Sequence, residues 1–279
     1  MQNVYLMMHQ MREDVRTLTA QVSEALRNAG LTVRMEPWLS KAAGEPETGD
    51  ATDFAMEAIV AVGGDGTLLR ATQTAIAHNV PILGINVGHI GFLVETELEH
   101  LSEACQRLRE DRFSIETRMM LDVVRQDGTV KTALNDVVIS RGGYARLIAV
   151  KASVGEELIG RYIADGLIIS TPTGSTGYSL SAGGPIVCPE VECILLSPIC
   201  PHSLQHRPVV ANAAQTVTIA LDCAPEQNAQ LDVDGRIAGM LSGNETVSIR
   251  RSQTVTKLIR FGSHSFFHRI RAKLTEWSC

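Results

Sequence analysis

The 279-residue sequence has no excess of positive charge, no closely spaced cysteine pair and no membrane-spanning segment. Its formal net charge of −6 gives no basic field that would attract nucleic acid or an anionic membrane surface. Residues 166–189 carry no charge, but their glycine, serine, threonine and proline content excludes a membrane helix. We therefore expect neither nucleic acid nor membrane as a partner, and a polyanionic substrate must be bound by local donors.

The six cysteines are scattered and include no CxxC pair. The spacing of Cys188, Cys193 and Cys200 matches no common zinc pattern, and His264 and His268 lack further metal ligands. Reduced thiols are the simpler interpretation. Because the apolar run Val4–Met8 is too short for a signal peptide, we expect a cytoplasmic protein without a metal site of its own.

Strands and helices alternate over the first part of the chain. Apolar segments predict strands at 4–8, 31–35, 58–62 and 81–86, and apolar residues at helical spacing predict helices over 15–29, from about Thr67, and over 98–108. Gly30 stands where a helix C-terminus favours a left-handed residue. Residues 37–53 are polar and contain several glycines and prolines, which predicts a mobile loop. The alternation favours a parallel, doubly wound sheet.

The pattern becomes mostly β after about residue 113. An Asp127-Gly128 turn predicts a hairpin between residues 119–125 and 130–140. Further strands are expected at 147–154, 158–163, 167–170, 217–221, 230–233 and 246–250, with a helix after Ser175. Residues 264–277 predict an amphipathic helix with Phe267, Ile270 and Leu274 on one side.

These patterns divide the chain into three parts. We expect an α/β domain at 1–113, a β-rich domain at 114–257, and a C-terminal helix at 258–279 that packs back on the first domain.

Two common phosphate-binding motifs are absent, because neither GxxxxGK[ST] nor GxGxxG occurs. Instead, a predicted strand leads into Gly63-Gly64-Asp65-Gly66-Thr67. Glycines let the backbone turn sharply near a ligand, and the following helix N-terminus offers N–H groups to phosphate. An aspartate there makes sense if a carboxylate must accept a proton beside the phosphates. The same residues also fit a tight turn capped by an aspartate side chain.

Two segments of the β-rich part carry unexpected polar residues. Asn135-Asp136 stands in an apolar strand, and an unpaired buried polar group costs roughly 1–3 kcal/mol. Ligand hydroxyls or a base edge would satisfy these residues, as would a strand end or a bulge. Residues 165–185 contain a long uncharged run of small hydroxyl residues and glycines. This composition suits backbone packed against a ligand, with Tyr178 able to stack on a heteroaromatic ring.

Taken in order, these motifs resemble those of the bacterial NAD kinase family. The resemblance rests on Gly63–Thr67, Asn86–Leu93, Asn135-Asp136 and Asp165–Gly184, and it covers essentially the whole chain. It implies a Rossmann-like N-terminal domain, then an all-β, sandwich-like C-terminal domain, with the last helix returning to the first domain. A homodimer or homotetramer is also implied.

The implied reaction moves a phosphoryl group from ATP, or another donor, to the 2′-hydroxyl of the adenosine ribose of NAD, with Mg²⁺. Its product is NADP. The resemblance makes Asp65 the general base and places Gly63, Gly64, Gly66 and Thr67 in the phosphate loop. The implied substrate-binding residues are Asp65, Gly66, Arg70, Asn135, Asp136, Asp165, Thr176, Gly177, Tyr178, Ser179, Leu180, Ser181 and Cys200.

Three positions depart from the family's pattern. Ile163 stands where Arg or Lys is common, Arg236 where Gln or Asn is commoner, and Gly177 where Ala is frequent. These departures bear on substrate fit more than on chemistry. Two other functions stay open. A lipid kinase with a similar glycine loop would need an apolar cleft or a basic membrane-facing patch, and a non-catalytic NAD(P) sensor would have no use for Asp65.

Overall fold

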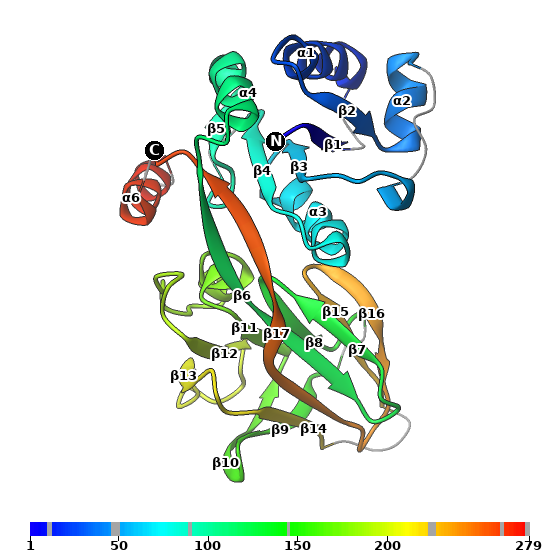
Figure 1. The fold of residues 1–279 in the computed structure, drawn as a ribbon. Helices are drawn as coiled ribbons and strands as arrows, with labels where there is room; N and C mark the ends of the chain where they lie inside the picture. The colour runs from blue at the N-terminus through cyan, green and yellow to red at the C-terminus, as the bar shows by residue number, and fades with distance from the viewer. Residues whose placement is uncertain are drawn as a thin grey trace. The chain divides into compact units, whose positions relative to one another are not determined.

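The computed structural model divides the chain into two compact units (Figure 1). Unit 1 contains residues 1–117 and 256–279, and unit 2 contains residues 118–255. The structure describes residues 1–9, 13–45, 51–88, 91–143, 146–222, 227–262 and 265–276. Strands β6 (Ser114–Arg125) and β17 (Thr246–Arg260) each begin in one unit and end in the other. Unit 1 is therefore built from two separate chain segments, whereas unit 2 is one continuous segment.

Unit 1 is built on a parallel sheet whose strand order is β4-β3-β1-β2. These strands are β1 (Asn3–Met8), β2 (Thr32–Met35), β3 (Ala58–Val62) and β4 (Ile82–Asn86). The end of β17 pairs in parallel with β4 through Leu258 and Ile82, and the short strand β5 (Thr96–Glu97) also pairs with β4. Every residue of β3 and β4 is buried, as expected for parallel strands covered on both faces. The predicted parallel sheet is confirmed.

The helices of unit 1 are α1 (Val15–Asn28), α2 (Pro37–Ala43), α3 (Asp65–His78), α4 (Leu101–Arg109) and α6 (Phe266–Glu276), with single 3₁₀ turns at Ala51–Asp53 and Leu98–His100. Helix α1 buries Leu18, Val22 and Leu26 in the core of this unit. Gly30 follows α1 with φ +83°, the left-handed conformation that its position predicts.

Two expectations for unit 1 differ from the structure. Residues 37–43 are helical rather than loop, because Pro37 suits the first helical position, Leu39 is buried and Gly44 ends the helix with φ +72°. Residues 46–50 of that segment lie outside the described residues. Helix α3 begins at Asp65, two residues before the predicted start.

Helix α6 also differs from its predicted amphipathic pattern. Phe267 is 68% exposed, and Arg269 is buried instead. The side chain of Leu274 lies outside the described part of the chain, as do His264 and Trp277.

Unit 2 contains two antiparallel sheets. One has the order β13-β12-β11-β8-β15-β16. Its strands are β8 (Asp136–Ser140), β11 (Gly166–Ser170), β12 (Cys193–Ile199), β13 (Val209–Asn212), β15 (Ala229–Val233) and β16 (Arg236–Leu241). The other sheet of this unit pairs β10 (Glu157–Ala164), β9 (Ile148–Val154), β14 (Val217–Leu221) and β17, and β6 pairs with β17 and with β7 (Val130–Ala133).

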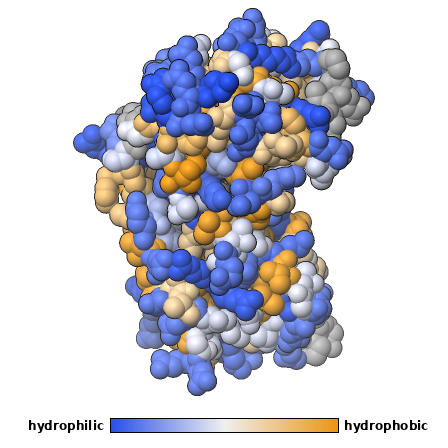
Figure 2. All heavy atoms as spheres, in the orientation of Figure 1, coloured by the Kyte–Doolittle hydropathy of each residue, from blue (hydrophilic) through white to orange (hydrophobic). Residues whose placement is uncertain are grey.

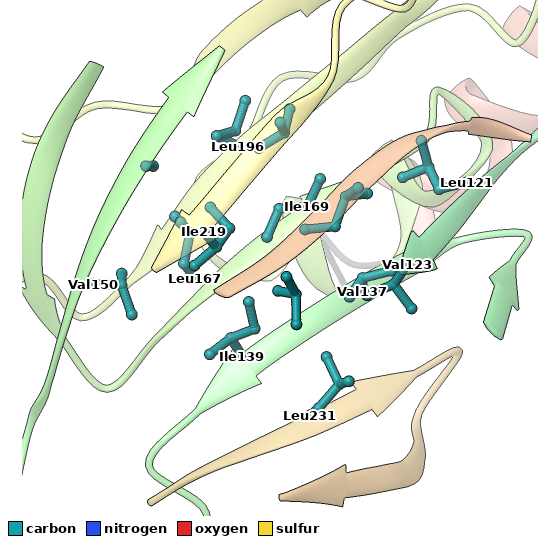
Figure 3. Close-up of a cluster of buried hydrophobic side chains, with 14 of the residues drawn as sticks. Leu121, Val123, Val137, Ile139, Val150, Leu167, Ile169, Leu196, Ile219 and Leu231 are labelled. Carbon is teal, nitrogen blue, oxygen red and sulfur yellow. The ribbon is translucent and has the colours of Figure 1, made fainter. Parts of the chain in front are cut away.

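Both sheets contribute buried side chains to one core, which is drawn in Figure 3. Leu167 and Ile139 come from one sheet, and Val150, Ile219 and Leu121 come from the other. This arrangement is the predicted sandwich-like all-β unit.

The predicted hairpin holds only for β6 and β7, which pair from Leu121 with Ala133 to Val124 with Val130. Residues 130–140 are not one strand, because the chain leaves β7 after Ala133 and enters the other sheet at Asp136. Strands β12, β13 and β16 were not predicted, and β17 continues to Arg260 rather than ending near residue 250. The helix expected after Ser175 is a 3₁₀ turn (Thr173–Thr176) followed by the short α5 (Tyr178–Ser181).

Within the described residues, no helix is both long and apolar enough to span a membrane. On the face drawn in Figure 2, hydrophobic residues are interspersed with hydrophilic ones. Cys105, Cys188, Cys193 and Cys200 are free thiols, and Cys223 and Cys279 lie outside the described residues.

Candidate active site

The glycine loop of unit 1 connects the end of β3 to the start of α3. Gly63 has φ +149°, and a Cβ atom there would lie 2.3 Å from Thr67 Oγ1, so the backbone and the packing both require glycine. Gly64 immediately precedes α3, and its carbonyl accepts the Thr67 N–H at 3.0 Å. Gly66 is exposed in the first turn. The loop therefore presents a helix N-terminus, the usual backbone site for a phosphate group.

Asp65 is the first residue of α3, and two backbone N–H groups hold its half-buried carboxylate. Phe92 N–H donates to Oδ2 at 2.8 Å, and Leu93 N–H donates to Oδ1 at 3.0 Å. A Cβ atom at Gly91 would lie 2.2 Å from Asp65 Oδ1, so the absence of a side chain there makes room for the carboxylate. Each carboxylate oxygen keeps a further lone pair for a substrate hydroxyl.

Arg70 lies one turn further along α3 and contacts the ends of two strands. Its guanidinium forms a two-point ion pair with Glu36, with Nη2 at 2.8 Å from Oε2, and also donates to the carbonyl of Met8. Met8 ends β1, and Glu36 directly follows β2. Arg70 thus organises the carboxyl edge of the parallel sheet, where ligands bind in open α/β folds. Its expected contact with phosphate would have to coexist with these bonds or replace them.

A corner of unit 2 contains Asn135 and Asp136, where the chain passes from β7 to β8. The carboxylate of Asp234 accepts the N–H groups of Leu134 at 2.8 Å, Asn135 at 2.7 Å and Asp136 at 3.3 Å. Asp234 has φ +48° in the turn between β15 and β16. The sequence indicated only a turn at Asp234-Gly235, and no local signal showed that its carboxylate would bind a distant strand break.

Asp136 is 5% exposed, and its carboxyl lies near two others. Burial, and then the charges of Asp234 and Asp232, raise the pKa of Asp136 to about 7. Burial also raises the pKa of Asp234, although the three N–H donors and Arg236 oppose this shift. Asn135 Oδ1 is buried and has no hydrogen-bond partner among the described residues. The corner therefore favours a ligand that brings hydrogen-bond donors.

The loop after β11 packs directly on this corner. Thr171 donates its N–H to Asn135 O at 2.9 Å and its hydroxyl to Leu134 O at 2.6 Å. A Cβ atom at Gly174 would lie 2.1 Å from Asn135 O, which excludes any side chain there. At Gly177 an added Cβ would lie 3.7 Å from Asn135 Nδ2 and 3.9 Å from Asp136 Oδ2. Two segments far apart in the sequence, both predicted to bind substrate, are therefore neighbours.

The residues of α5 divide into accessible and internal ones. Tyr178 is 47% exposed and Ser181 is also exposed, so both are available to a ligand. Ser179 is buried, and its hydroxyl is paired with that of Ser197 at 2.8 Å. Thr176 donates its hydroxyl to Thr173 O at 3.2 Å, and Leu180 is half-buried. The stretch predicted to bind the dinucleotide thus includes one hydroxyl, that of Ser179, which is hydrogen-bonded inside the protein.

Asp165 and Cys200 lie at the start of β11, the end of the strand that is far from Asp136. Asp165 pairs with Arg141, with Nε and Oδ1 2.8 Å apart, and donates its N–H to Ile199 O at 3.0 Å. Asp136 instead pairs with Ser170, at the far end of the strand. A strand rises about 3.3 Å per residue, so roughly 17 Å separate Asp165 from Ser170. Within one chain, the structure does not bring Asp165 and Cys200 to Asn135-Asp136.

A glycine loop that presents an aspartate at a helix N-terminus, in an α/β unit joined to a β-sandwich, defines a class of phosphate-binding enzymes. Residues 4–113 match the family model of the ATP-NAD kinase N-terminal domain, and residues 134–261 match that of the C-terminal domain. The chain therefore belongs to the NAD kinase family, and it is an enzyme with NAD kinase function. The lipid-kinase and non-catalytic alternatives are set aside.

Individual relatives agree with the family models. The NAD kinase of Geobacter sp. (strain M21) is 42% identical over 263 residues, which cover 91% of each chain. Among solved structures, yeast NADH kinase complexed with NADH has a TM-score of 0.84 and 26% identity over 97% of this chain and 86% of its own. An NAD kinase from Archaeoglobus fulgidus in complex with ATP has a TM-score of 0.74 and 25% identity over 98% of both chains.

Proposed function

We propose that the chain transfers the γ-phosphoryl group of ATP to the 2′-hydroxyl of the adenosine ribose of NAD, with Asp65 as general base. The observation that carries this proposal is the fixed carboxylate of Asp65 at the phosphate-binding end of α3. The two structural neighbours support the choice of substrates, since one holds NADH and the other holds ATP.

In the proposed step, the 2′-oxygen attacks the γ-phosphorus as the bond to the β–γ bridging oxygen breaks. The hydroxyl proton passes to Asp65, and the products are NADP and ADP. A carboxylate is a weak base, so most of the benefit comes from holding the hydroxyl in line with the phosphoryl group. The glycine-loop N–H groups supply positive potential toward the phosphates.

The second group of residues binds the dinucleotide. Asn135 and Asp136 accept donors from ribose or base, Gly177 lets the ligand approach this corner, and Tyr178 stacks on a ring. Thr176, Ser179, Leu180 and Ser181 shape the same surface, with Ser179 acting through its internal hydrogen bond. Asp165 and Cys200 keep the substrate-binding role that the family resemblance gives them.

Mg²⁺ is proposed to enter with ATP. In the described ranges, no group of three or more His, Cys, Asp or Glu side chains is placed to hold a metal ion. Proteins usually hold Mg²⁺ through one or two carboxylates together with substrate phosphates. When bound, the ion would neutralise phosphate charge. We further propose that the protein is cytoplasmic and forms a homodimer or homotetramer, which light scattering would test.

The direct test is formation of NADP from NAD, ATP and Mg²⁺, compared with other nucleoside triphosphates and with polyphosphate as donors. Asp65→Asn should fold normally and lower turnover by on the order of a hundredfold or more. Asp127→Asn, in an exposed turn of unit 2, is the matched control and should keep full activity. Near-normal turnover of Asp65→Asn would exclude Asp65 as the base.

A further inference from the structure

The backbone that holds Asp65 is itself held from its other side by two buried arginines. Arg269 Nη1 donates to Phe92 O at 3.0 Å, and Arg260 Nη1 donates to Leu93 O at 2.9 Å. Arg269 is on α6 and Arg260 ends β17, so both come from the second chain segment of unit 1. The side chains are 8% and 9% exposed.

One carboxylate joins the two arginines. Glu95, whose side chain is 1% exposed, accepts from Arg269 Nη2 at 2.8 Å and from Arg260 Nη1 at 3.1 Å through Oε2. Its Oε1 accepts the Phe261 N–H at 2.7 Å, and its own N–H donates to Gly84 O of β4 at 2.9 Å. Arg260 also pairs with Glu116. The cluster is thus neutral in sum and anchored to the sheet.

The peptide group between Phe92 and Leu93 links Arg269 to Asp65. Because a peptide group is planar, its C=O and N–H point in opposite directions and turn together. The C=O of Phe92 accepts from Arg269, and the N–H of Leu93 donates to Asp65 Oδ1. A change in the guanidinium contact therefore rotates the donor that orients the carboxylate.

Stability alone is a poor explanation for this cluster. A buried ion pair is often no more stabilising than well-packed apolar side chains of similar volume. Burial, and then the charge of Arg260, lower the pKa of the Arg269 guanidinium, while Glu95 opposes this shift. The cluster thus keeps an arginine where burial disfavours its charge.

We infer that Arg269, together with Glu95 and Arg260, is a positioning residue that fixes the Asp65 carboxylate through the backbone of Phe92 and Leu93. The inference rests on the proposed role of Asp65 as base. It assigns a task in phosphoryl transfer to the C-terminal helix, which reaches the proposed base through this backbone.

Arg269→Gln is the test. The variant should fold, because Glu95 keeps Arg260 and the Phe261 N–H, and because Arg269 borders an existing cavity of about 380 Å³, which the shorter side chain only widens. Turnover should fall about tenfold with unchanged KM values for NAD and ATP, as expected when a group is displaced by less than an ångström. Arg269→Lys keeps the positive charge, so its turnover should lie between those of the wild type and Arg269→Gln. Arg271→Gln, an exposed change on the same helix, should match the wild type.

The decisive measurement repeats Arg269→Gln in the Asp65→Asn background. If Arg269 acts through Asp65, Arg269→Gln should lower the turnover of the Asp65→Asn protein by less than about twofold, since the effects of coupled residues are not additive. A full tenfold loss in both backgrounds would show a merely structural role and overturn the inference. If Arg269→Gln does not fold, Arg269→Lys replaces it in the same cycle. Normal turnover of Asp65→Asn alone would instead defeat the proposed base, which distinguishes the two failures.

Discussion

Asp65 in unit 1 and Asp136 in unit 2 are aspartates of two candidate binding regions, and their surroundings differ in kind. Backbone N–H groups of Phe92 and Leu93 surround the Asp65 carboxylate, which stays half-exposed. The Asp136 carboxyl is buried beside two other carboxylates, and its pKa rises to about 7.

The comparison indicates that aspartate suits two different proposed tasks, proton acceptance at Asp65 and ligand binding at Asp136. The two N–H donors that hold the Asp65 carboxylate fix its direction and leave lone pairs for a hydroxyl. Burial beside like charges favours the protonated form, which binds groups rather than accepting a proton from a reacting hydroxyl. The first setting suits a base, and the second suits recognition of a polar ligand.

The largest effect is expected for Gly91→Ala. The new Cβ would lie 2.2 Å from Asp65 Oδ1, so the carboxylate must move away from its two donors. Turnover should fall by on the order of a hundredfold with little change in the KM for NAD, because misplacement of about 1 Å has this cost. Steady-state kinetics measure both constants. Gly143→Ala, where an added Cβ meets nothing within 4 Å, should behave like the wild type.

Asp136→Ala should give the opposite kinetic pattern. Loss of a ligand acceptor should raise the KM for NAD about tenfold while turnover changes little, since binding is lost equally in ground and transition states. The same steady-state assay decides the outcome. A fall in turnover at unchanged KM would mean that the two aspartates do not divide the tasks in this way.

The stability of unit 2 should depend on the ionisation of Asp136. The folded protein keeps the Asp136 proton up to about pH 7, whereas an unfolded chain releases it near the ordinary value of 3.8. Rising pH across this window therefore lowers the free energy of unfolding. Asp136→Asn cannot ionise, so from about pH 5 to about pH 8 it should gain roughly 2–3 kcal/mol relative to wild type. Thermal unfolding at both pH values measures this difference, and parallel curves would contradict the prediction.

The smallest effect is expected for Ser179→Ala. Removing this hydroxyl leaves Ser197 without its 2.8 Å partner, which should cost about 1 kcal/mol of stability. Denaturant unfolding measures the loss. The exposed Ser181→Ala is the matched change, and it should affect the KM for NAD more than stability. An equal loss of stability in both variants would argue against the internal role of Ser179.

Local patterns predicted much of this molecule. The apolar strands of the parallel sheet, the turn at Gly30 and the glycine loop each depend on neighbouring residues, so the sequence displays them directly. The other proposed site residues came from the family resemblance, and the structure adds that Gly174 and Gly177 pack against the Asn135-Asp136 corner.

Long-range contacts explain what the sequence could not show. Asp234 fixes a strand break 99 residues earlier, and Arg269 contacts a backbone carbonyl 177 residues earlier. Neither residue has a local signal, because its partner is set by the fold. Amphipathic spacing on α6 favoured Phe267 as a buried residue, but the buried charge of Arg269 overrode it. The helix at 37–43 was missed because its proline and glycine mark its two ends rather than a loop.

Unit 1 is built from two separate chain segments, and this affects the order in which the two units can fold during synthesis. Domains generally fold as units, with N-terminal ones first during synthesis. Here unit 1, the first to emerge, lacks one of the strands that pair with β4 until residues 256–260 are made. Unit 2, encoded later but in one piece, is complete at residue 255. The nascent chain thus completes unit 2, with the Asn135-Asp136 corner, before the residues that complete unit 1 are made.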